Sequence, residues 1–137
     1  PGVKLVERNA ADGLADSHHL KHSTAEAEER DRQRQALWRG PELFVSLKTV
    51  NGLASTGMAR IEGADLGIFN VRTATKARGK GYASILVAYL LTWGQAQGAR
   101  RAFLQVDVAN APAIALYGRF GFVTRYVYWH RVGPAPA

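Results

Sequence analysis

The stretch Arg78-Gly79-Lys80-Gly81-Tyr82-Ala83 decides how this chain is interpreted. It holds two glycines and two cations, and it lies between a β-like run at 68–73 and a long apolar run at 85–91. Glycines let a backbone curl tightly and approach a ligand closely. A helix that begins at such a turn presents free N–H groups and the positive end of its dipole. The order of strand, basic glycine turn and helix therefore predicts a cradle for a phosphate or another polyanion.

The spacing of this turn excludes two well-known phosphate motifs. The turn lacks the Gly-Lys-Ser/Thr end of a Walker loop. It also lacks the third glycine and the following acidic residue of the dinucleotide fingerprint. On these residues alone, an ordinary basic loop remains the alternative to a phosphate site.

The composition predicts one globular domain, residues 1–137, with a basic second half. Of the 137 residues, 47% are apolar, which is enough for a hydrophobic core. Residues 1–59 carry 8 basic and 8 acidic side chains, whereas residues 60–137 carry 10 basic and 3 acidic ones, so the whole net charge of +7 belongs to the second half. Such an imbalance favours an anionic partner, either a phosphorylated cofactor or nucleic acid. A merely cationic surface is the alternative.

Several classes of protein are excluded or disfavoured by what the sequence lacks. Without cysteine there can be no disulfide, no thiolate–metal site and no cysteine nucleophile. No apolar run approaches the roughly 20 residues that span a bilayer, so no membrane partner is expected. No basic-then-apolar segment opens the chain, so no signal peptide is expected and a cytoplasmic location is the default.

Hydrophobic periodicity and turn signals predict six strands and four helices. Three of the strands form an antiparallel meander, with turns at Asn51-Gly52 and 62–65. The crossover through the third helix implies parallel pairing of 66–73 with 102–108. This helix is expected to bury Ile85, Leu86, Tyr89, Leu90 and Trp93. The expected strands are 3–7, 43–48, 53–61, 66–73, 102–108 and 122–131, and the expected helices are 9–22, a helix capped by Ser23 that runs to about 38, 82–97, and a short one from the Asn110 cap to Gly121.

A second motif lies one helix and one strand downstream of the glycine turn. It comprises Asn110, Ala113, Leu116-Tyr117 and Gly121-Phe122. Together with Arg-x-x-Gly-x-Ala at 78–83, it resembles the GNAT superfamily of acetyl-coenzyme A-dependent N-acetyltransferases. The resemblance is strongest over 66–131 and looser before that. Two motifs in the right order are far more specific than either one alone.

The resemblance implies an α/β fold of the α+β kind and a site for acetyl-coenzyme A as cosubstrate. The sheet would be mixed and largely antiparallel, with about six to seven strands, about four flanking helices, and one parallel strand pair splayed at the cofactor site. By motif position, residues 78–83 would bind the pyrophosphate, and the backbone of 71–73 would bond the pantetheine amides. Asn110 would contact the pantetheine arm and Tyr117 would lie near the thioester sulfur. The implied cofactor-binding residues are Val71, Arg72, Thr73, Arg78, Gly79, Lys80, Gly81, Tyr82, Ala83 and Asn110, and the implied catalytic residue is Tyr117.

Acetyl transfer to an amine makes three chemical demands, and the sequence offers groups for two of them. A backbone N–H near 71–73 would stabilise the oxyanion of the tetrahedral intermediate. Tyr117 would donate a proton to the leaving thiolate, unless it is only a buried packing residue. The attacking amine also needs a base or a water chain, and no carboxylate stands out for this role. Asp107 lies near the carboxyl end of its expected strand, where it could line the acceptor cleft. Glu62 and Asp65 are interpreted as turn acids.

The histidines are not expected to hold a metal, and no metal cofactor is predicted. His18 and His22 have helical i, i+4 spacing, but no third ligand is nearby, so exposed helix histidines are the better interpretation. His130 lies beside Trp129 and two tyrosines in the last expected strand. That cluster is interpreted as core, with a dimer contact or an acceptor-pocket wall as alternatives.

The leading hypothesis is an N-acetyltransferase acting on a primary amine of a small molecule or peptide. The alternative is a non-catalytic acyl-coenzyme A-binding or regulatory module, which the missing base would suit. Nucleic-acid binding ranks lowest, because the aromatic residues are not interleaved with basic ones as a stacking surface. A homodimer is possible, and the acceptor is not identified by these residues.

Overall fold

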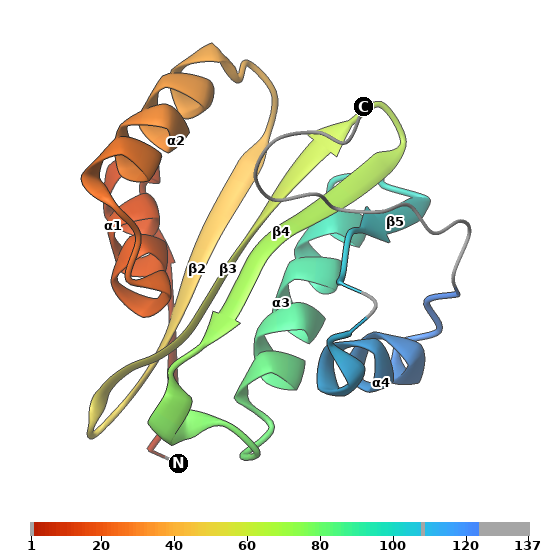
Figure 1. The fold of residues 1–137 in the computed structure, drawn as a ribbon. Coiled ribbons are helices and arrows are strands. Elements are labelled where there is room, and N and C mark those ends of the chain that lie inside the picture. The colour runs from red at the N-terminus through yellow and green to blue at the C-terminus, as the bar shows by residue number, and fades with distance from the viewer. Residues whose placement is uncertain (1, 108, 124–137) are drawn as a thin grey trace, which may run out of the picture. The chain divides into compact units, whose positions relative to one another are not determined.

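The computed structural model describes residues 2–107 and 109–123. They fall into two compact units, Pro1–Leu104 and Gln105–Ala137, and each is described by itself. The first unit is an α+β arrangement in which helices cover a mixed sheet (Figure 1). Its elements are β1 (Lys4–Arg8), α1 (Ala10–Lys21), α2 (Ala25–Leu37), β2 (Glu42–Thr49), β3 (Gly52–Glu62), β4 (Asp65–Thr73), the 3₁₀ turn η1 (Thr75–Ala77), α3 (Tyr82–Ala96) and β5 (Arg101–Leu104). The described part of the second unit contains α4 (Ala111–Arg119).

The sheet has the order β1-β2-β3-β4-β5, which is the chain order. The first four strands are antiparallel, and β5 pairs with β4 in parallel after the crossover through α3. The predicted fold class and the predicted parallel pair are therefore confirmed. Within the described residues the sheet has five strands rather than six or seven, and nearly all of the strand expected at 122–131 lies outside those residues.

The last strand of the sheet, β5, is shorter than the strand expected at 102–108. Its ladder with β4 ends at the pair Ile68↔Leu104, and residues 105–107 have no regular structure. The Asp107 carboxylate accepts a hydrogen bond from the Ala109 N–H at 2.8 Å and folds the chain into a turn. Because β4 continues to Thr73, residues 69–73 have no ladder partner on the β5 side among the described residues. This is the splay that the family resemblance implies.

A β-bulge lies in β4 at the start of this unpaired edge. Thr56 pairs with Arg72 and Met58 pairs with Phe69, so Gly57 alone faces two residues, Asn70 and Val71. Asn70 takes a left-handed conformation with φ 56°, which asparagine tolerates better than most residues. Such an extra residue bends the bulged strand and strengthens its local twist.

The two faces of the sheet are covered by different helices. In Figure 1, α1 and α2 lie on one face and α3 on the other. On the α1 face, Leu14 packs with Phe44 and Met58. On the α3 face, Leu86 and Leu90 are fully buried and approach the backbone of Gly57. Because neighbouring residues of a strand point to opposite faces, Gly57 faces α3 and Met58 faces α1.

The face of α3 that is buried differs from the predicted one. Leu86 and Leu90 are buried as expected, but Val87 and Gly94 complete the stripe, and Ile85 is 41% exposed. The prediction from the sequence assigned the buried face of this helix to its large apolar side chains. The structure instead brings Gly94 against Leu66, at a contact that has no room for a Cβ atom.

Two capping and turn predictions are wrong by one residue. Thr24, not Ser23, caps α2, because its hydroxyl accepts from the Ala27 N–H at 3.1 Å. The β2–β3 hairpin turns through Val50 and Asn51, while Gly52, with φ 102°, already pairs with Thr49. Glycine thus supplies the positive φ just after the turn rather than within it.

Two helix glycines provide a matched test of the packing. A Cβ added at Gly13 in α1 would lie 2.5 Å from the Phe44 Cβ, whereas one added at Gly118 in α4 would meet nothing within 4 Å. We expect Gly13→Ala to lower the free energy of unfolding by about 1–3 kcal/mol through overpacking. Gly118→Ala should instead raise it by up to about 1 kcal/mol through helix propensity. Urea unfolding of the two variants checks the opposite signs, and two changes of the same sign would contradict the described α1 contact.

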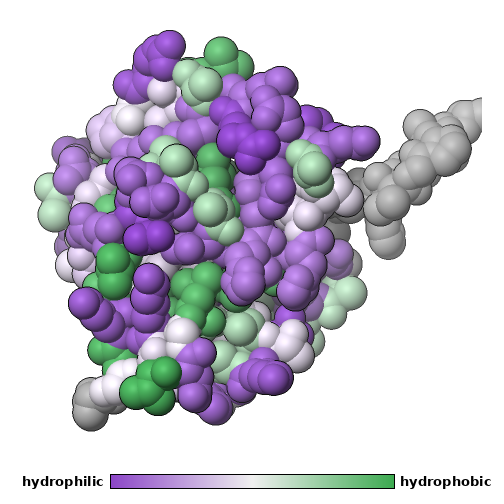
Figure 2. All heavy atoms as spheres, turned by 90° about the vertical axis from the view of Figure 1, so that its left-hand side faces the viewer, coloured by the Kyte–Doolittle hydropathy of each residue, from purple (hydrophilic) through white to green (hydrophobic). Residues whose placement is uncertain are grey.

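Helix α2 is attached to the rest of its unit by polar contacts. It buries none of its residues. Figure 2 shows that hydrophilic side chains cover most of the side that carries α1 and α2. Among the described residues, no helix combines the length and apolar character needed to cross a membrane.

Candidate functional site

The glycine turn has the backbone conformation that the sequence predicts. Gly79 and Gly81 have φ values of 76° and 79°, and a Cβ at either position would meet nothing within 4 Å. Arg78 and Lys80 are exposed on the same turn. Gly81 is the N-cap of α3 and makes no side-chain capping bond, and the first turn of α3 carries no acidic side chain. The positive end of α3 is therefore open to an anion.

The amide groups of this turn are not engaged by the rest of the described chain. The N–H groups of Gly79 and Gly81 donate no hydrogen bond to a described residue, and those of residues 82–84 lie in the first turn of α3, where a helix has no internal acceptor for them. Free backbone donors at a helix N-terminus, beside two cations, form a ready anion site. Tyr82 and Ala83 contribute the first turn of α3 to this arrangement.

The end of β4 offers a second set of backbone groups. The Arg72 carbonyl accepts from the Ser55 hydroxyl at 2.7 Å, so the backbone groups of Arg72 face β3. Successive residues of a strand present their N–H and C=O groups to opposite sides. Those of Val71 and Thr73 therefore point to the unpaired edge, where an extended ligand can add as a further strand. Of the three predicted backbone contacts, Val71 and Thr73 have the accessible groups.

The Arg72 side chain lies on the α1 face of β4 and is held by two neutral partners. Its Nε donates to the Ser17 Oγ at 3.2 Å, and its Nη2 donates to the Asn70 Oδ1 at 3.3 Å. Burial lowers the pKa of Arg72, and the charge of Asp31 raises it to a lesser extent. Arg72 is thus a positioned and partly desolvated cation next to the bulge.

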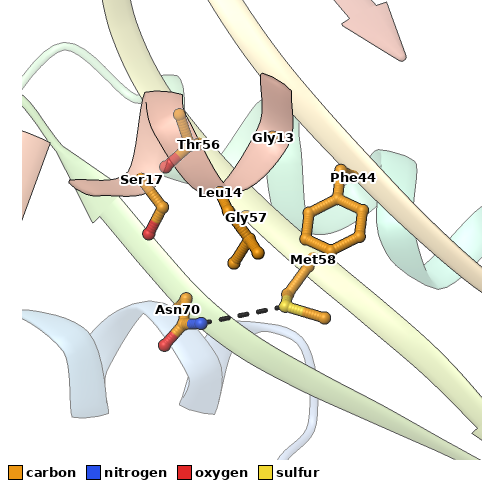
Figure 3. A pocket seen from close by; sticks show the side chains of 8 residues that line it. All are labelled: Gly13, Leu14, Ser17, Phe44, Thr56, Gly57, Met58 and Asn70. Atoms are coloured by element: carbon orange, nitrogen blue, oxygen red, sulfur yellow. Dashed lines mark hydrogen bonds between the residues drawn. The ribbon is translucent and has the colours of Figure 1, made fainter. Parts of the chain in front are cut away.

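Ser17 and Asn70 also line a small pocket between α1 and the sheet. Figure 3 shows the pocket lined by residues from α1, β2, β3 and β4, with the Asn70 amide directed to the Met58 sulfur. It leaves room for about one water molecule. The Thr56 hydroxyl lines this pocket, is 3% exposed and has no hydrogen-bond partner among the described residues. The lining residues are Gly13, Leu14, Ser17, Phe44, Thr56, Gly57, Met58 and Asn70.

Asn110 and Tyr117 belong to the second unit. Asn110 caps α4 through its Oδ1, which accepts from the Ala113 N–H at 3.2 Å, so its side-chain NH₂ is left for another partner. Pro112 lies in the first turn, as predicted. Tyr117 is 8% exposed and packs edge-on against Phe122, with 5.9 Å between ring centroids. Burial raises the pKa of Tyr117, so its phenol holds its proton more firmly than a free tyrosine.

The acids of the second half have structural contacts. Asp65 accepts from the Arg101 Nε at 2.9 Å across the β4–β5 pair. Asp107 supports the turn that leads to α4 and is exposed. Glu62 ends β3 and is exposed. No carboxylate among these three is held in a geometry that points to a general base.

The interpretation of His18 as an exposed helix residue is wrong. It is 5% exposed, its Nε2 lies 2.8 Å from the Asp31 Oδ2, and its Nδ1 lies 3.8 Å from the Glu28 Oε1. His18 therefore joins α1 to α2. His22 instead ends α1 in a left-handed conformation, and no group of metal ligands occurs in the described part of the chain. The aromatic cluster around His130 lies outside the described residues.

Sequence reasoning missed Ser17 and Thr56. Both are small hydroxyl residues among other small residues, and nothing local distinguishes them. The spacing of Gly13, Leu14 and Ser17 in a helix of weak amphipathic character was the one available signal, since it indicates a close approach of α1 to the sheet.

Known proteins resemble this chain over most of its length. The sequence model of the acetyltransferase (GNAT) family matches residues 12–122. An uncharacterised N-acetyltransferase of Bacillus subtilis, YobR, is 33% identical over 79 residues, which are 58% of this chain and 32% of that protein. Aminoglycoside N(6')-acetyltransferase type 1 of Serratia marcescens is 32% identical over 91 residues, which are 66% of this chain and 58% of that protein. The chain thus spans less than two thirds of these curated relatives.

Solved structures share the fold at low sequence identity. The enzyme AAC(6')-Iy, in complex with the bisubstrate analogue CoA-S-monomethyl-acetylneamine, superposes with a TM-score of 0.75 and 13% identity. The match covers 97% of this chain and 100% of that one. At this identity the likeness concerns the fold.

Proposed function

The chain belongs to the GNAT acetyltransferase family, whose model matches residues 12–122, and on that premise we propose that it moves an acetyl group from acetyl-coenzyme A to a primary amine of a small molecule or peptide. The observation that carries the proposal is the open glycine turn at 78–81, where the N–H groups of Gly79 and Gly81 have no partner among the described residues. Named relatives of the chain are acetyltransferases, which supports an acyltransferase activity.

In this proposal the cosubstrate binds along the first unit. The N–H groups at 79–83 and the cations Arg78 and Lys80 hold the pyrophosphate. The free edges of Val71 and Thr73 hold the pantetheine arm as an added strand. Asn110, whose side-chain NH₂ is free for another partner, is proposed as a further ligand of the pantetheine arm, as the family resemblance implies. Acetyl-coenzyme A supplies an activated thioester, and the N–H edge of β4 next to the bulge stabilises the oxyanion that forms when the amine attacks.

Tyr117 is proposed as the general acid that returns a proton to the departing thiolate. A tyrosine is protonated at neutral pH, as a proton donor must be, and burial raises the pKa of Tyr117 further, which keeps the phenol neutral over a wider pH range. The amine must also lose a proton. Because none of the three second-half carboxylates has the geometry of a base, a water molecule is the proposed acceptor of that proton.

The alternative function is a non-catalytic acyl-coenzyme A-binding or regulatory module. The absence of an evident base among Glu62, Asp65 and Asp107 favours it. It predicts that the chain binds the cofactor and acetylates no amine. Polyamines, aminoglycosides, amino acids and peptides form the panel that separates the two functions.

Isothermal titration with coenzyme A tests the shared premise of both functions. We expect saturable binding with a dissociation constant on the order of 10 μM, within the range usual for enzyme substrates. Because the proposed site is charge-based, the affinity should fall as salt is raised. No binding at near-millimolar coenzyme A would overturn both functions.

A further inference from the structure

The Arg72 side chain carries an inference about the acceptor, and it rests on the proposed acetyl transfer. We propose that Arg72 selects acceptor amines that also carry an anionic group, a carboxylate or a phosphate, by binding that group on the α1 face of β4. The preferred acceptor would then be a small amine with an acidic substituent rather than a polycationic amine.

The guanidinium of Arg72 is oriented but not saturated. An arginine has five N–H donors in a fixed fork. Ser17 and Asn70 each take one of them, at 3.2 and 3.3 Å, which leaves three without a partner among the described residues. Each of the two terminal nitrogens keeps at least one free N–H. This is the end-on pair that binds the two oxygens of a carboxylate or phosphate.

Arg72 also lacks the carboxylate partner that the other arginines of the sheet have. Within 4 Å, Arg8, Arg60 and Arg101 each contact an acidic side chain, whereas Arg72 contacts none in the described part of the chain. The Asp31 carboxylate acts on Arg72 from farther away, and its own contacts are to His18 at 2.8 Å and Arg34 at 3.9 Å. A partly buried cation without an ion pair gains the most from an anionic ligand.

The residues that orient Arg72 border a small pocket. Arg72 pairs with Thr56 in the β3–β4 register, and the Thr56 hydroxyl is buried in the pocket without a partner among the described residues. The two residues that hold Arg72 line the same pocket (Figure 3). The side chains that orient Arg72 thus border a pocket with an unsatisfied buried hydroxyl, and this pocket has room for about one water molecule that would satisfy it.

The position of Arg72 suits an acceptor-binding role. It lies between Val71 and Thr73, whose backbone edges are proposed to hold the thioester arm. Its side chain points to the α1 face, opposite the face that α3 covers. An acceptor anchored there by its anionic group would lie next to the bulge, and so near the unpaired edge of β4.

Steady-state kinetics with three matched amines tests the proposal: ethanolamine, β-alanine and phosphoethanolamine. We expect the wild-type protein to favour the two anionic amines in kcat/KM. Arg72→Gln should lower kcat/KM for them about 10- to 100-fold more than it lowers kcat/KM for ethanolamine. Arg72→Lys keeps the positive charge without the guanidinium fork, so its kcat/KM for the anionic amines should lie between those of wild type and Arg72→Gln. Arg101→Gln removes an exposed arginine from β5 and is the matched control. It should leave kcat/KM for all three amines unchanged.

Each outcome decides the proposal. A wild-type preference for β-alanine over phosphoethanolamine, or the reverse, identifies the anion as carboxylate or phosphate. Equal use of all three amines, or an equal loss for all three in both Arg72 variants, overturns the role of Arg72. Titration with coenzyme A distinguishes a failure of the Arg72 proposal from a failure of the proposed acetyltransferase function. If coenzyme A binds and ethanolamine is acetylated without anion preference, only the Arg72 proposal fails. If neither binding nor transfer occurs, the proposed function fails and this inference with it.

Discussion

Replacement of Gly81 by valine is expected to raise the dissociation constant for coenzyme A about 100-fold. Gly81 has φ 79° and caps α3. A β-branched residue in this conformation costs roughly 1–2 kcal/mol or moves the backbone. A moved backbone misdirects amides whose charged hydrogen bonds are worth about 1.5–3 kcal/mol each. A loss near 2.7 kcal/mol corresponds to the 100-fold change. Isothermal titration measures it.

Gly63 offers a matched control for this substitution. It lies in the β3–β4 turn with φ 61°, and a Cβ there would also meet nothing within 4 Å. Gly63→Val should therefore impose a similar backbone penalty on stability and leave coenzyme A affinity unchanged. Equal losses of affinity in the two variants would show that strain, not the position of the turn, controls binding. No loss in Gly81→Val would contradict the pyrophosphate role of 78–83.

The second large effect is expected for Tyr117→Phe, which should lower kcat about 100-fold at constant coenzyme A affinity. A general acid contributes about 10²–10⁴-fold to rate. Phenylalanine keeps the ring that packs on Phe122, so the fold should be little changed. Tyr89→Phe in α3 is the control, since it removes a surface hydroxyl that bonds to Glu7. Parallel losses of kcat and cofactor affinity in Tyr117→Phe would instead make the tyrosine a packing residue.

Tyr117 also determines how the free energy of unfolding should change at high pH. Burial raises the pKa of Tyr117 above the value of about 10 in the unfolded chain. Above pH 10 the unfolded state releases this proton before the folded state does, so stability falls as pH rises through the folded pKa. The stabilising contribution is complete below about pH 10. Urea unfolding of wild type and Tyr117→Phe between about pH 8 and 11 should show a smaller loss in the variant.

The sequence predicted well the features that local chemistry determines. The positive φ values of Gly79 and Gly81, the Asn110 cap and the parallel crossover each follow from glycine, a capping side chain or a period of hydrophobic residues. The site residues themselves stay predictions until cofactor binding is measured. Their backbone setting at 71–73 and 78–83 is nonetheless the one that the sequence led us to expect.

Features that arise from long-range packing were not predictable. Ser17 contacts Arg72 across 55 residues, and His18 is buried only because α2 folds over α1. The bulge at Asn70 depends on the register of two strands, and no single residue of β4 predicts it. Hydroxyl and histidine side chains do not reveal such partners in a single sequence, since the same residues are common on surfaces.

Helix α2 has a consequence for how the molecule exchanges its amide hydrogens. Because α2 buries no residue, detaching it exposes little apolar surface and forfeits mainly the contacts of His18 and of Gln35. Local opening of α2 should therefore need far less free energy than global unfolding. The amides of α2 are expected to exchange early and those of β3 late. Helix α2 can then open locally while the sheet and the glycine turn keep their shape.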